Sequence, residues 1–232
     1  MKRTLGMLLV LTMIIGLLPA YAAGGIETTE ETWYAVSKSD DYKVYYYSTV
    51  TNTGDEPAAI KNLLFEIKDA DDRVLESTSK FSLYPSVLTP GQTGWLVITQ
   101  DVKDIAKKAV IDHCDLEIAG KVDDDHAANL LPATAEYLKE DEDENEDMLR
   151  IAVTNPGEGN AFEITAAMAA RDASGKLLYI VGAGTRDIGL PAGGALTLRS
   201  QVRSDIMDAL EDENAEIASV EALAYTVEDL DD

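Results

Sequence analysis

An internal repeat is the feature that most constrains how this chain folds. Four short patterns occur twice in the same order, about 103 residues apart, and their spacing drifts by only two residues. The pairs are Val50-Thr51-Asn52-Thr53-Gly54 with Val153-Thr154-Asn155-Pro156-Gly157, Asp69-Ala70 with Asp172-Ala173, Leu88-Thr89-Pro90-Gly91 with Leu190-Pro191-Ala192-Gly193, and Asp104-Ile105 with Asp205-Ile206. Chance does not account for four matches in one order. The repeat therefore predicts two tandem modules of one fold.

Within each copy, apolar residues alternate with polar ones. The alternating apolar residues are Tyr42, Val44, Tyr46, Val50, Leu63, Phe65, Ile67, Leu149, Ile151 and Val153. A period of two is typical of β-strands that bury one face. Turn-forming Gly, Pro, Asn and Asp residues separate the runs. The pattern predicts an all-β fold in which each copy is an antiparallel β-sandwich.

A stretch with helical spacing precedes the last strands of each copy. The apolar residues of these stretches are Val102, Ile105, Ala106 and Ala109 in the first copy and Val202, Ile206, Ala209 and Leu210 in the second. Ser204 precedes the second stretch and fits the N-cap position of a helix. We expect one short helix in each module.

The eight residues from Glu140 to Asp147 carry seven acidic side chains. Such a run repels itself and cannot be buried, so it is either a linker between the modules or a solvated loop that opens the second one. We predict a first module at residues 23–130, an acidic linker at 131–147 and a second module at 148–232. The two modules are expected to fold separately.

The first 22 residues have the pattern of a secretory signal peptide. Lys2 and Arg3 form a positive region, an apolar run follows at residues 8–18, and residues 20–22 place alanine at the two positions that signal peptidase reads. The apolar run is about a dozen residues long, whereas roughly 20 are needed to span a bilayer. We therefore expect a secreted or otherwise extracytoplasmic protein with no membrane insertion after cleavage.

The chain is strongly acidic, with a formal net charge of −24. Cleavage of the signal would remove Lys2 and Arg3 but no acid, which makes the balance still more negative. Nucleic acids and anionic membranes are polyanions that recruit Lys and Arg, so neither is an expected partner. Weak binding of divalent cations or basic partners suits this charge. Cys114 is the single cysteine, so no intrachain disulfide forms.

The order of turns and strands resembles the FxLYD domain family of exported bacterial proteins, which are immunoglobulin-like sandwiches. The resemblance rests on Asn52-Thr53-Gly54, Phe65-Glu66-Ile67-Lys68-Asp69 and Leu88-Thr89-Pro90-Gly91. The second copy keeps the two turns, but in Met168-Ala169-Ala170-Arg171-Asp172 only the aspartate remains. The resemblance covers about 50 residues of each module and implies two tandem immunoglobulin-like domains. It implies an accessory or interaction module and carries no functional residues.

Nucleophilic catalysis is not predicted at His113 and Cys114, the one place where such residues are adjacent. They lie in a predicted strand, so their side chains leave opposite faces and cannot form a thiolate–imidazole pair. Cys114 is expected to be a small core residue. We predict no catalytic residue in this chain.

A specific metal site is not predicted either. Two histidines and one cysteine do not make a zinc set of four protein ligands. A calcium loop beginning at Asp141 fails, because its sixth and twelfth places hold Glu146 and Ala152. The acids at residues 69–72 and 123–126 are expected to hold cations only weakly. We predict no cofactor.

The remaining functional hint is aromatic. Tyr45 and Tyr47 fall on the strand face opposite to Tyr46, so one sheet face is expected to carry tyrosines outward as a weak binding surface. The alternative is that these tyrosines form an aromatic ladder covered by Trp33 and Tyr34. The sequence thus favours an exported, non-catalytic binding or adhesion-type protein whose partner is a protein or glycan at the cell surface. The alternative is a secreted enzyme, or enzyme subunit, with a site where the modules meet.

We expect the mature protein to begin at Ala23 or within two residues of it, because signal peptidase cleaves after a short apolar run and small residues. The intact mass of protein exported by the native host measures this. A product that retains Lys2 and Arg3 in the membrane fraction would contradict the prediction.

Overall fold

The computed structural model describes residues 25–38, 41–103, 110–139, 147–185 and 189–230. In this part of the chain nearly all regular structure is β-strand, with one helix, and every strand pairing is antiparallel. The predicted all-β antiparallel sandwich fold is confirmed.

The strands form four sheets, which we name A to D. Sheet A has the order β1 (Ile26–Lys38), β2 (Asp41–Asn52), β6 (Thr93–Val102), β5 (Ser82–Tyr84). Sheet B has the order β4 (Val74–Thr78), β3 (Ala58–Lys68), β7 (His113–Val122). Sheet C has the order β12 (Leu177–Gly184), β11 (Thr165–Arg171), β14 (Ser219–Asp229), β8 (His126–Leu131). Sheet D has the order β13 (Ala195–Gln201), β10 (Met148–Thr154), β9 (Ala133–Leu138), and the helix is α1 (Ser204–Asp212).

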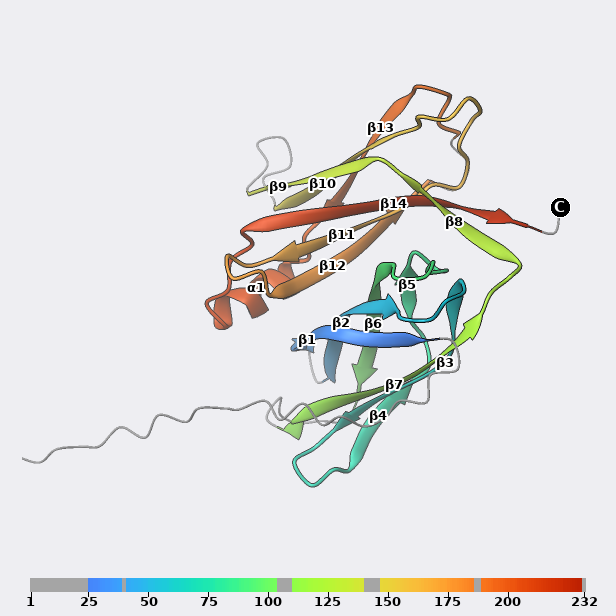
Figure 1. The fold of residues 1–232 in the computed structure, drawn as a ribbon. Coiled ribbons are helices and arrows are strands. Elements are labelled where there is room, and N and C mark those ends of the chain that lie inside the picture. Colours follow the sequence, from blue (N-terminus) through green and yellow to red (C-terminus); the bar gives the residue numbers. More distant parts are fainter. Residues whose placement is uncertain (1–24, 39–40, 104–109, 140–146, 186–188, 231–232) are drawn as a thin grey trace, which may run out of the picture.

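The sheets are stacked as four layers in the order B, A, C, D (Figure 1). Between sheets B and A, the rings of Tyr46 and Phe65 lie 4.9 Å apart in a core to which both sheets contribute. The interior between sheets C and D includes Leu149, Ile151 and Met168, which are fully buried. Each repeat therefore contributes one sandwich.

A further apolar contact joins sheets A and C. Tyr45 and Tyr47 alternate with the core residues of β2, so they lie on the face of sheet A that points away from sheet B. With Tyr34 and Trp95 they belong to the same buried cluster as the residues of sheet C. All residues from 166 to 170 in β11 are buried, so both faces of that strand are covered. The two repeats share a continuous apolar interior, which differs from the separate modules expected from the sequence.

Polar contacts fix the register of this junction. The Arg171 Nη1 of sheet C donates to Glu30 Oε2 of sheet A at 2.8 Å, and the backbone N–H of Leu177 donates to Glu30 Oε1 at 2.7 Å. The Glu30 carboxylate thus receives a hydrogen bond at each oxygen from the other repeat.

The two Asn-x-Gly turns make equivalent hydrogen bonds in the two copies of the repeat. Asn52 and Asn155 are both buried, and the side-chain amide of each donates two hydrogen bonds of 2.8 Å to backbone carbonyl groups. Each side-chain oxygen also accepts a hydrogen bond from the N–H two residues further on. The partners are Glu56, Leu88 and Gly54 in the first copy and Gly159, Leu190 and Gly157 in the second. The matched patterns therefore serve the same structural purpose.

Strands β8 and β9 correct the predicted module boundary. β8 pairs with β14 in sheet C, and β9 pairs with β10 in sheet D. Residues 126–138 thus belong to the sheets of the second repeat. The predicted end of the first module at residue 130 and the predicted linker at 131–147 are therefore wrong for these residues. Because β9 and β10 are neighbouring strands, the acidic segment connects two strands of one sheet. The acidic run therefore lies between two strands of sheet D, after β8 and β9, and does not join the two repeats.

Helix α1 is the predicted helix of the second copy, and its buried residues are Ile206, Ala209 and Leu210. It begins at Ser204, and its N-cap is Arg203 without a side-chain hydrogen bond, so the expected N-cap role of Ser204 is wrong. The core of the helical stretch expected in the first copy, at 104–109, lies outside the described residues, as do the signal peptide at 1–22 and most of the acidic run.

Replacing Asn52 or Asn155 by alanine is expected to lower the free energy of unfolding by about 1–3 kcal/mol in each case, because the two hydrogen bonds from each side-chain amide to backbone carbonyl groups are lost. Urea denaturation followed by circular dichroism measures the loss. Asn62→Ala, at an exposed position of β3, serves as the control. Equal stabilities for all three variants would contradict the stabilising role of the Asn52 and Asn155 side chains.

Candidate functional site

A cavity lies beside α1, at one end of the second sandwich. α1 packs its apolar side against the sandwich through Ile206 and Leu210. After the helix, Asn214 adopts a left-handed conformation with φ of 53°, and the N–H of Ala215 donates to the carbonyl oxygen of Leu210 at 2.9 Å. This turn sends the chain back toward β14. A hollow remains between the helix with its following turn and the end of β9.

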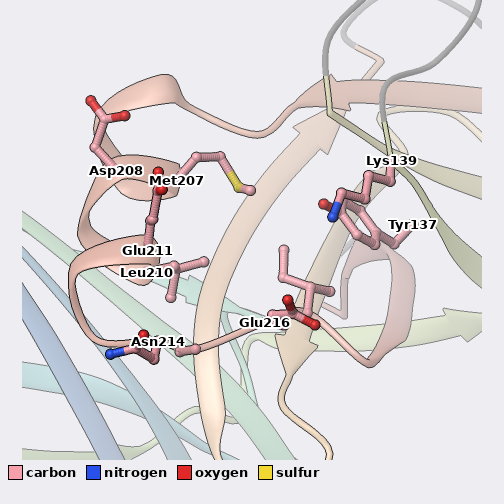
Figure 2. A pocket seen from close by; sticks show the side chains of 10 residues that line it. Tyr137, Lys139, Met207, Asp208, Leu210, Glu211, Asn214 and Glu216 are labelled. Atoms are coloured by element: carbon pink, nitrogen blue, oxygen red, sulfur yellow. The ribbon is translucent and has the colours of Figure 1, made fainter.

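The cavity has a volume of about 510 Å³, within the range of roughly 300–1,000 Å³ that is usual for ligand pockets. Its lining residues are Tyr137, Lys139, Met207, Asp208, Leu210, Glu211, Asn214, Ala215, Glu216 and Ile217. Figure 2 shows Met207 and Leu210 reaching from the helix toward the space, with Tyr137 and Lys139 on the opposite side. The apolar lining residues on the helix side are Met207, Leu210, Ala215 and Ile217, and we call these four residues the floor; the lining as a whole is mixed in polarity.

The rim of the cavity is acidic. Asp208, Glu211 and Glu216 contribute three carboxylates, against the single ammonium group of Lys139. The last turn of α1 holds no basic residue, although the C-terminal end of a helix carries a partial negative charge that favours cations. The cavity thus combines apolar contact surface with an excess of negative charge.

One wall of the cavity is held in place by a hydrogen bond. The Tyr137 hydroxyl group donates to Asp147 Oδ2 at 2.8 Å, which ties the end of β9 to the start of β10. Tyr137 was not predicted as a site residue, because residues 131–147 were expected to form a linker.

A second hollow, of about 680 Å³, lies where the repeats meet. Tyr84 of β5 lies directly over Gly182 of β12, where a β-carbon would come within 2.2 Å of the Tyr84 hydroxyl oxygen. A larger residue at 182 would therefore force the Tyr84 side chain to shift. Glu163 is the one charged residue that lines this hollow, and it is exposed. The described lining of this hollow therefore contains no buried carboxylate.

Tyr45 and Tyr47 do lie on the predicted face of their strand, but the expectation that they form an exposed binding surface is wrong. They are 4% and 1% exposed, because the second repeat covers them. The Tyr45 hydroxyl group donates to Asp205 Oδ2 at 2.8 Å, and the Tyr47 ring meets Tyr179 edge to face at 5.5 Å. Burial, followed by the hydrogen bond to Asp205, raises the pKa of Tyr45. These tyrosines form the junction between the repeats.

His113 and Cys114 lie in a strand, β7, as the sequence predicts, and their side chains have different neighbours. Cys114 is half-buried against the core between sheets A and B. Burial raises the pKa of its thiol to about 12, with the charges of Glu31 and Asp115 adding to the effect. His113 Nδ1 instead lies 3.0 Å from an oxygen of Asp112. Cys114 is therefore a protonated thiol at neutral pH, without an imidazole to activate it.

The acids proposed as weak cation ligands are engaged in local structure. Asp69 Oδ1 accepts hydrogen bonds from the N–H groups of Asp71 and Arg73, and the Arg73 side chain pairs with Asp69 Oδ2 at 2.7 Å. Hydrogen bonding to that arginine lowers the pKa of Asp69. Among the described residues, no group of three or more His, Cys, Asp or Glu side chains could hold a metal ion. Within the same ranges, no helix is long and apolar enough to cross a membrane.

Comparison with known proteins adds no family assignment. No protein-family model matches the chain, and no curated protein sequence matches it.

The connection between the repeats contains one pH-sensitive pair. Asp123 is 6% exposed, and His126 Nδ1 lies 2.9 Å from its Oδ1. The hydrogen bond with Asp123 raises the pKa of His126 from 6.5, and the charges of Asp229 and Asp125 add to this. Burial alone would raise the pKa of Asp123, but His126 and Lys121 outweigh it and hold the pKa below 3.8.

The stability that this pair contributes is therefore expected to be greatest between about pH 4 and pH 6.5. Because the pKa of His126 is raised in the folded protein, its contribution to stability is fully present below pH 6.5. This contribution is lost as the pH rises through the folded-state pKa of His126. The lowered pKa of Asp123 means that its contribution is lost as the pH falls through its own folded-state value. Melting temperatures of the parent and His126→Gln, measured from about pH 5 to about pH 8, should converge as the pH rises. A constant difference across this range would contradict the prediction.

Proposed function

We propose that this chain is an exported, non-catalytic binding protein that engages a partner through the cavity beside α1. The observation that carries the proposal is the cavity itself, which joins an apolar floor to charged groups at its rim. Ligand pockets generally have this composition, since apolar contact supplies affinity and a few polar groups supply orientation.

Export is supported by the signal-like start of the sequence. A non-catalytic role is supported by the state of Cys114, whose thiol stays protonated at neutral pH. We also propose that the repeats are FxLYD-like, immunoglobulin-like domains. The equivalent hydrogen bonds of Asn52 and Asn155 support this, because both asparagines lie in the Asn-x-Gly turns on which the resemblance rests.

The partner is proposed to be a protein at the cell surface, since the cavity has the size and mixed polarity of a site for side chains. The alternative of an enzyme with its site between the repeats has weaker support. The hollow at that junction is lined by one charged residue, the exposed Glu163.

Filling the cavity is expected to abolish binding without unfolding the protein. Met207 is half-buried and points into the space (Figure 2), so Met207→Trp places a larger side chain there. Fluorescently labelled mature protein, incubated with cells of the native host, is expected to lose at least tenfold of its cell-bound signal, which corresponds to about 1.4 kcal/mol of binding free energy.

Val74→Trp is the matched control, because Val74 is 49% exposed on β4, in the sheet furthest from α1. It is expected to bind as the parent does. If Met207→Trp and the parent bind equally while both are folded, the cavity is not the binding site.

A further inference from the structure

We propose that the cavity beside α1 binds a basic segment of a partner protein, in which an apolar side chain is flanked by lysine or arginine. This rests on the proposed function, because it names the ligand class of the same site. The apolar side chain would enter between the helix and β9, and the flanking cations would lie at the carboxylates of the rim.

The apolar half of the inference follows from the floor of the cavity. Met207, Leu210, Ala215 and Ile217 are its apolar members on the helix side. Met207 is unbranched and has a polarisable sulfur, so it adapts to the shape of an entering side chain. Its place on an acidic helix, at a half-buried position, gives it an open side toward the cavity. A side chain without apolar surface would leave this floor in contact with water.

The cationic half follows from the charges at the end of α1. Glu211, Asp212 and Glu213 are consecutive at the C-terminal end of the helix, where the helix itself contributes a partial negative charge. No basic residue occupies the last turn, and the ion pairs of the described residues include none of these three acids. Like charges gathered at this end of a helix destabilise the free protein, so a cation bound there relieves repulsion as well as making contacts.

Lys139 determines on which side of the cavity the cation of the partner lies. It lies across the cavity from α1, beside Tyr137 (Figure 2). Its charge repels a second cation on the β9 side, so the flanking lysine or arginine of the partner is directed to the helix side, where Asp208 and Glu211 lie. Anionic ligands are opposed by the three carboxylates of the rim, which outnumber this one ammonium group.

The test uses isotope-labelled mature protein and short capped peptides in about 150 mM salt, where long-range attraction is screened beyond about 8 Å. The probe is a Lys-Leu-Lys peptide, and the comparison peptides are Glu-Leu-Glu and Lys-Ser-Lys. Amide chemical shifts are expected to move and saturate at one equivalent with Lys-Leu-Lys. The moving signals should be those of the lining residues from 207 to 217 together with Tyr137 and Lys139. Lys-Ser-Lys and Glu-Leu-Glu should each bind at least tenfold more weakly.

A charge-matched pair of variants separates the rim from the overall charge. Glu211→Gln with Glu216→Gln is expected to raise the Kd for Lys-Leu-Lys about tenfold. Asp55→Asn with Glu117→Gln removes the same charge from exposed positions of the first repeat and is expected to change the Kd less than twofold. Equal losses in the two double variants, or shifts that spread over the acidic surface without saturating, overturn the inference.

Three other outcomes have distinct meanings. Equal binding of Lys-Leu-Lys and Glu-Leu-Glu, abolished by Met207→Trp, overturns the basic ligand class and leaves the proposed binding function standing. Saturable shifts of the same residues with calcium chloride alone overturn it in favour of a metal site. Binding of Lys-Leu-Lys that is unchanged in Met207→Trp overturns both the inference and the use of this cavity.

Discussion

Aromatic rings on the outer face of sheet A lie against the small side chains of sheet C, and this packing joins the two repeats. Tyr47 is 1% exposed and meets Tyr179 of the second repeat edge to face. Buried aromatic residues contribute large apolar areas, and aromatic pairs add about 0.5–1.5 kcal/mol beyond area alone. The run of alanines in β11 matters as well, because its small side chains let sheet C approach β5 of sheet A. Larger residues at Ala167 or Ala169 would force the sheets apart.

The candidate site depends on the same junction, although it lies at its margin. Asp205 is at the start of α1, and it accepts a hydrogen bond from Tyr45 of sheet A. Arg203, which precedes the helix, lies over the Tyr45 ring with its guanidinium carbon 5.2 Å from the ring centre. The first repeat therefore holds the beginning of the helix whose other end forms the cavity. A change at the junction reaches the site by displacing α1, without any contact between the junction residues and a ligand.

The sequence predicts the architecture where the two copies behave alike and fails where they differ. The Asn-x-Gly turns, the alternating strands and α1 all follow from local patterns that each copy satisfies within itself. The face of Tyr45 and Tyr47 was predicted correctly, but their burial was not, since the surface that covers them comes from more than a hundred residues further along the chain. β8 lacks a clear alternation. In β9, Ala133, Ala135 and Tyr137 do alternate with polar residues, but the acidic run that follows favoured a linker over a strand. The cavity was missed for the same reason, as one of its walls is the end of β9.

By the repeat, sheet A of the first copy corresponds to sheet D of the second, and sheet B corresponds to sheet C. The copies meet through sheets A and C, so each uses a different face for the contact. A heterologous contact of this kind does not close on itself, and identical repeats joined this way would continue as a filament. Arg150 and Thr197 stand in sheet D where sheet A has Tyr47 and Trp95. At the opposite end, Glu66 of sheet B stands where sheet C has Ala169. Polar side chains at these positions of the two outer faces therefore disfavour the addition of a third repeat by the same packing.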